Sequence, residues 1–125
     1  MTEVTKKACD LSKKLLAQIN EYCGQYTGVD GKDIVSELSI MALQEILEEG
    51  FTLHNYLVEH NLFEDKSSIK SNLIQLEGFM NRLAITKENA EKLKLSNAVQ
   101  IWNQTKIAIA VLAGSVLDEY EEKVE

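Results

Sequence analysis

The chain contains no proline, and three of its six glycines fall within the stretch 24–31. Because glycine and proline are the strongest local interruptions of regular structure, this stretch is the clearest predicted loop. A length of 125 residues, with 45% hydrophobic and 26% charged side chains, is typical of one globular domain, here residues 1–125. A chain of this size can bury roughly two-thirds of its extended surface, which excludes intrinsic disorder.

Long hydrophobic runs are also missing. The longest, Ile107 to Leu117, is interrupted by Gly114 and Ser115, whereas a membrane-spanning helix needs about 20 predominantly apolar residues. The lysines near the N-terminus are followed by Asp10 and not by an apolar segment, so no secretion signal is predicted. We therefore expect a cytoplasmic protein without a membrane span.

Cysteine and arginine are scarce. Cys9 and Cys23 lie on one predicted helix, where a rise of 1.5 Å per residue separates them by about 21 Å, too far for a disulfide. We expect both thiols to be reduced. Arg82 is the only arginine, and 20 acidic against 13 basic side chains give a net charge of −7. Such a chain lacks the basic face typical of nucleic-acid-binding proteins, so no nucleic-acid partner is expected.

Four segments carry apolar residues at alternating steps of three and four, the spacing of a helix with one buried face. They predict helices over about 31–61, 69–95 and 96–122, preceded by one over 4–26. The segments show no alternation of period two, which strands would require. The predicted fold class is therefore all-α, a four-helix up-and-down antiparallel bundle with short connections.

The boundaries of the second and third helices admit alternatives. Asp30 is a suitable cap for the second helix. That helix either runs unbroken through Gly50 or breaks there, with Thr52 capping a new helix. The third helix ends either near Thr86 or near Ser96, and the second choice is favoured because it gives four helices of similar length.

Acidic residues concentrate between residues 30 and 65, where nine acids stand against Lys32 alone. Four of them define the predicted partner surface on the second helix: Glu37, Glu45, Glu48 and Glu49. A second acidic group, residues 118–125, is expected to face the basic residues of the first helix, which are Lys6, Lys7, Lys13 and Lys14.

The carboxylates of Glu45, Glu48 and Glu49 are helical neighbours and are the metal candidates of the sequence. Glu-x-x-Glu-Glu at this position resembles the acidic Mg²⁺-binding helix of all-α nucleotide pyrophosphatases of the MazG kind. The resemblance covers only these residues, and the second acidic element of such enzymes is missing. His54 and His60 point to different faces of the helix, so they do not complete a metal site. No catalytic residue and no cofactor is predicted.

The segment 107–111 is apolar at every position, although a helix at the corner of a bundle has about half its surface in water. Ile107, Ala110 and Val111 are therefore predicted to form a self-association face, and the protein is expected to be a homodimer. The alternative is a central helix surrounded by shorter pieces of a less regular bundle. Gly50, Gly78 and Gly114 fall at nearly one level of the bundle, which indicates either close helix packing or a small apolar pocket.

These features predict a non-catalytic protein-protein interaction or regulatory module that self-associates through its fourth helix. One alternative is an acidic inhibitor or immunity-type protein that binds a basic enzyme by charge complementarity. Another is a metal-dependent nucleotide pyrophosphohydrolase that uses the carboxylates of Glu45, Glu48 and Glu49.

Overall fold

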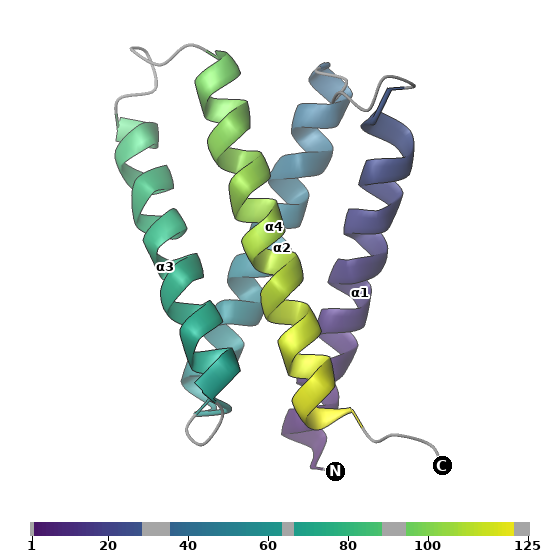
Figure 1. Ribbon diagram of the computed structural model, residues 1–125, viewed down its shortest axis with the longest axis vertical. Coiled ribbons are helices and arrows are strands. Elements are labelled where there is room, and N and C mark those ends of the chain that lie inside the picture. The colour runs from purple at the N-terminus through teal and green to yellow at the C-terminus, as the bar shows by residue number, and fades with distance from the viewer. Residues whose placement is uncertain (1, 29–35, 64–66, 89–94, 122–125) are drawn as a thin grey trace.

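The computed structural model describes residues 2–28, 36–63, 67–88 and 95–121. It contains four α-helices that pack against one another as an antiparallel bundle (Figure 1): α1 (Glu3–Tyr26), α2 (Glu37–Glu59), α3 (Ser67–Glu88) and α4 (Leu95–Tyr120). The predicted all-α, four-helix fold is confirmed.

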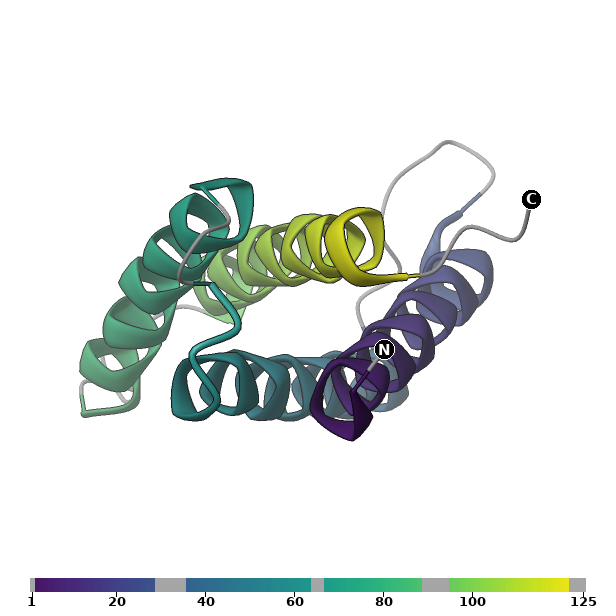
Figure 2. The same cartoon turned by 90° about the horizontal axis from the view of Figure 1, so that it is seen from below.

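The bundle is not square in cross-section. Seen from below, α2 and α4 lie opposite each other, with α1 and α3 at the two ends (Figure 2). In Figure 1, α4 passes in front of α2 at an angle, and α4 packs against all three other helices. Helix α4 therefore has the contacts of a central helix, although its front face remains open.

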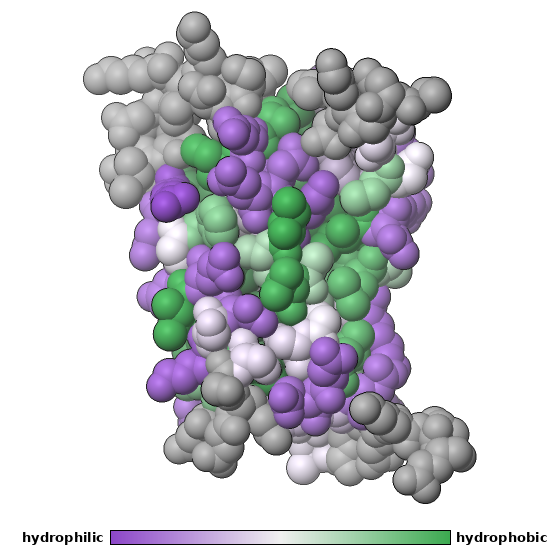
Figure 3. Space-filling view, in the orientation of Figure 1, coloured by the Kyte–Doolittle hydropathy of each residue, from purple (hydrophilic) through white to green (hydrophobic). Residues whose placement is uncertain are grey.

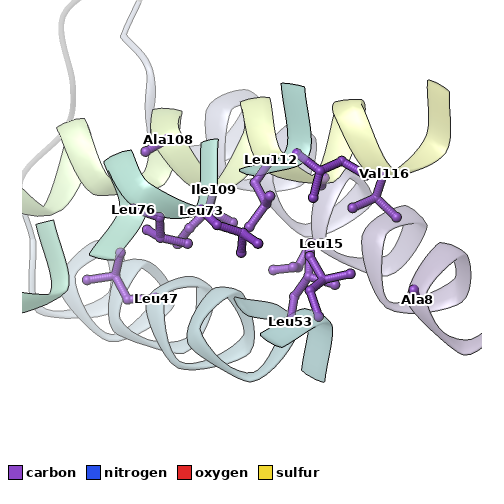
Figure 4. Packing of buried hydrophobic residues seen from close by; sticks show 13 residues of the cluster. Ala8, Leu15, Leu47, Leu53, Leu73, Leu76, Ala108, Ile109, Leu112 and Val116 are labelled. Carbon is purple, nitrogen blue, oxygen red and sulfur yellow. The ribbon is translucent and has the colours of Figure 1, made fainter. Parts of the chain in front are cut away.

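The main core lies where α4 meets the other helices (Figure 4). Its fully buried members are the residues that the helical spacing places on one face, such as Leu15, Leu53, Leu76, Ile109 and Leu112. A smaller cluster around Tyr22, Leu43 and Ile46 closes the end of the bundle where α1 stops and α2 begins. Burying these side chains supplies most of the free energy of folding.

The start of α2 differs from the prediction. The helix begins at Glu37, not near residue 31, because Ser36 accepts a hydrogen bond from the Ser39 backbone N–H and Ser39 Oγ accepts one from the Ser36 N–H. Asp30, the predicted cap, lies outside the described residues. Leu38, in the first turn of the helix, is 68% exposed, although the helical spacing places it on the same row as the buried Ile46 and Leu53.

The other boundaries decide between the alternatives left open by the sequence. Helix α2 continues through Gly50, so the alternative break there is wrong. Helix α3 ends at Glu88, two residues past the alternative end near Thr86 and before the favoured end near Ser96. Helix α4 begins at Leu95, next to the favoured start. No helix in the described parts of the chain is long and apolar enough to cross a membrane.

The two ends of the described chain lie at the same end of the bundle (Figure 1). Lys13 Nζ lies 2.8 Å from Glu121 Oε1, which confirms one contact between the basic residues of α1 and the acidic end of α4. This hydrogen bond to Glu121 raises the pKa of Lys13. Both thiols are free, with Cys9 buried and Cys23 exposed.

Candidate functional site

The exposed face of α4 is apolar at its middle. Ile107 is 59% exposed and Val111 is 49% exposed, while Ala110 beside them is half-buried. Figure 3 shows an apolar strip running down the centre of the molecule over α4. Ile109, on the opposite side of the helix, is buried in the core. Of the three residues predicted from the sequence for self-association, Ile107 and Val111 are thus exposed and Ala110 is partly so.

This face also carries no charge over a long distance. Between residues 99 and 117 the only charged side chain is Lys106. Lys106 is buried, with its Nζ 3.1 Å from Asn103 Oδ1 and 4.6 Å from the centre of the Tyr22 ring. The exposed part of this stretch is therefore neutral, on a chain of net charge −7.

Small residues lie beside the two exposed apolar side chains. Gly114 follows Ala110 by four residues, so both lie on one side of α4. A carbon added to Gly114 would meet nothing within 4 Å, which means that no other part of the described chain covers this glycine. We define the α4 face as Ile107, Ala110, Val111 and Gly114.

The four glutamates of the predicted acidic surface on α2 are not equally exposed. Glu37, Glu45 and Glu48 are exposed, as a partner surface requires. Glu49 is half-buried and turns toward α1, where its Oε1 lies 3.7 Å from Lys14 Nζ. Glu49 therefore belongs to the packing of α1 against α2.

The described part of the chain places no further metal ligand beside Glu45, Glu48 and Glu49. Within the described residues, no group of three or more His, Cys, Asp and Glu side chains comes together in a way that could hold a metal ion. His54 is buried and its Nδ1 lies 3.1 Å from Asn55 Oδ1, while His60 packs against the Tyr56 ring. Both histidines are engaged in local contacts of α2.

A pocket of about 160 Å³ lies between α1 and α2 near the cluster of Tyr22 and Ile46. Sequence reasoning placed one of its residues, Glu45, on the acidic surface but did not predict the pocket. Its walls come from two helices: Gln18, Glu21, Tyr22, Gln25 and Tyr26 from α1, and Ala42, Glu45 and Ile46 from α2. Because the lining comes from two helices, no spacing within either helix indicates the pocket.

The three glycines predicted at one level of the bundle have different surroundings. The position in front of Gly50 is filled by Ile109, whereas a carbon added to Gly78 would meet nothing within 4 Å. A hollow of about 200 Å³ beside Gly78 is lined by Gln75, Phe79 and Arg82 of the same helix. The possible apolar pocket inside the bundle at Gly50 is thus excluded, because Ile109 occupies that space.

A comparison of the chain with models of protein families, with curated proteins and with solved structures gives no match.

Proposed function

We propose that this chain is a non-catalytic interaction module that acts as a homodimer, in which two copies meet through the α4 face. The exposure of Ile107 and Val111 on a neutral stretch of helix carries the proposal. Exposed apolar residues gathered on one helix face are typical of protein interfaces.

The charge of the chain favours a second copy as the occupant. Two molecules of net charge −7 repel each other, so they approach most closely through a surface that carries no acid. The α4 face meets this condition, and a two-fold axis through it would set the same neutral surface of each copy against the other. Gly114 and Ala110 would allow the two helices to come close, since neither has a long side chain.

Sedimentation of the purified protein tests the proposal. We expect a mass near twice 14.1 kDa at micromolar concentration. Val111→Glu should yield a monomer with an unchanged helical spectrum, because it places a charge in the centre of the interface. Ile74→Glu is the matched control, since Ile74 is 61% exposed on α3, away from the α4 face, and this variant should remain dimeric. A wild-type chain that is monomeric at high micromolar concentration would contradict the proposal.

A second candidate function is the binding of a basic protein through the acidic surface of α2. The exposure of Glu37, Glu45 and Glu48 supports it. Charge complementarity mainly accelerates association and makes it sensitive to salt. The double variant Glu45→Lys with Glu48→Lys should slow association with such a partner and flatten its dependence on ionic strength. Hydrolysis of nucleoside triphosphates in the presence of Mg²⁺ would contradict both non-catalytic functions.

A further inference from the structure

The polar lining of the pocket between α1 and α2 consists of carboxylates, tyrosine rings and the amides of Gln18 and Gln25. Carboxylates come from both walls, Glu21 from α1 and Glu45 from α2, and the aromatic rings are those of Tyr22 and Tyr26. Its volume of about 160 Å³ is below the 300 Å³ at which small-molecule and cofactor sites typically begin. The space therefore suits a single side chain better than a cofactor.

The two carboxylates have no cationic partner in the described part of the chain. Glu21 accepts a hydrogen bond of 3.3 Å from Gln25 Nε2, which is neutral, and no ion pair joins either glutamate to a lysine or arginine there. Like charges on opposite walls of one pocket repel each other, and a cation between them removes this repulsion.

An independent observation points to a donor of hydrogen bonds. Gln18 lines the same pocket, and its Oε1 atom is buried without any hydrogen-bond partner among the described residues. A buried acceptor left without a donor is destabilising, and native proteins rarely leave one. A ligand that brings N–H groups would satisfy it.

A guanidinium group meets all three conditions. It is a permanent cation, its planar fork donates several hydrogen bonds to carboxylate and amide oxygens, and it stacks on aromatic rings. We propose that this pocket receives an arginine side chain of a basic protein partner, held between Glu21 and Glu45. Lys106 already lies over the Tyr22 ring, which makes Tyr26 the stacking ring for the incoming arginine.

This proposal rests on the second candidate function and is independent of dimerisation through α4. N-acetyl-argininamide is the probe, and its binding is followed by the NMR signals of the Tyr22 and Tyr26 rings and of the Gln18 side-chain amide. We expect saturable shifts in the millimolar range, because a single side chain makes few contacts. The citrulline analogue has the same shape without the charge and should produce no saturable shift.

Two double variants separate the pocket from the general acidity of the protein. Glu21→Gln with Glu45→Gln should weaken binding about tenfold or more, because hydrogen bonds to charged groups contribute on that scale. Glu37→Gln with Glu48→Gln changes the net charge equally but lies outside the pocket, and should leave the dissociation constant within about twofold. Tyr26→Leu should weaken binding severalfold.

Three results would overturn the proposal: no saturable shift, equal binding of the citrulline analogue, or an equal loss in both double variants. An equal loss in both would mean that arginine is attracted by the whole acidic surface of α2, so the basic-partner function would stand without the pocket. Circular dichroism of each variant shows that the bundle is intact, since all four glutamates are exposed.

Discussion

Ile109 of α4 fills the space in front of Gly50 of α2. A carbon added to Gly50 would lie 2.3 Å from Ile109 Cδ1 and 2.9 Å from its Cγ2, closer than carbon atoms approach one another. Ile109 is completely buried, so its side chain cannot turn into solvent to make room. The crossing of α2 and α4 therefore depends on the absence of a side chain at position 50.

Overpacking a core costs about 1–3 kcal/mol, and alanine returns about 1 kcal/mol in a helix interior. Gly50→Ala is therefore expected to lower the free energy of unfolding by up to about 2 kcal/mol. Chemical denaturation of both proteins measures the difference. Gly78→Ala is the control, since the added carbon meets nothing within 4 Å, and it should stabilise by up to about 1 kcal/mol. A stabilising Gly50→Ala would contradict the close crossing.

The spacing of apolar residues was enough to predict the four helices and most of their buried faces. Leu53 and Ile109, for example, lie at helical spacing from other apolar residues and are completely buried. The spacing could not predict that Ile109 faces Gly50, because a periodic pattern fixes the face of a helix and not the residue opposite it. The start of α2 was missed because Ser36 and Ser39 cap each other without the glutamate that makes a capping box recognisable.

The candidate sites were predicted to different degrees. A neutral apolar run identified the face around Ile107 and Val111, because a helix at the corner of a four-helix bundle leaves part of such a run in contact with water. The pocket of Glu21 and Glu45 was not predictable, since it depends on how α1 and α2 are rotated against each other. Of its residues, the sequence singled out only Glu45, and that for its charge.

The turn after α2 gives a prediction on backbone conformation. Asn61 has a φ of 53°, the Asn61 N–H donates to the Val58 carbonyl, and the Leu62 N–H donates to the Leu57 carbonyl. This is the Schellman pattern, in which the left-handed residue is most often glycine. Asn61→Gly should leave the thermal midpoint unchanged or raise it, whereas Asn61→Val should lower the free energy of unfolding by about 1–2 kcal/mol. An Asn61→Val variant as stable as the wild type would contradict the left-handed conformation at Asn61.

Tyr56 joins the end of α2 to the start of α1, because its hydroxyl donates a 3.0 Å hydrogen bond to the Val4 carbonyl. Tyr56→Phe should lower the free energy of unfolding by about 0.5–1.5 kcal/mol. Burial, followed by the negative charge of Glu59, raises the pKa of Tyr56 above its ordinary value of 10.0. The unfolded chain therefore loses this proton first, so the stabilisation is complete below pH 10 and falls as the pH rises through the folded pKa.

Urea denaturation at several pH values tests the direction of this pH dependence. The difference in stability between wild type and Tyr56→Phe should be constant at neutral pH and should narrow above pH 10, since the variant has no proton to lose at this position. A difference that stays constant, or widens, across the alkaline range would contradict the link between burial of this hydroxyl and stability.

The two cysteines should differ in reactivity. Cys9 is 3% exposed, and burial, followed by the negative charge of Glu121, raises its pKa. Cys23 is exposed near the other end of the same helix. Because the thiolate is the reactive form, alkylation at neutral pH should modify Cys23 first and Cys9 more than about tenfold more slowly.

Cys23→Ser should therefore remove the fast phase of alkylation and leave a single slow one. The rate of that slow phase should rise with urea, since Cys9 becomes accessible only when α1 opens from the bundle. Lys13→Ala, which breaks the ion pair with Glu121, offers a local comparison: if opening at this end limits the reaction, the variant should accelerate labelling of Cys9. Equal rates for the two thiols in the folded protein would mean that α1 does not keep Cys9 from solvent, and the packing of α1 in the bundle would be wrong at this end.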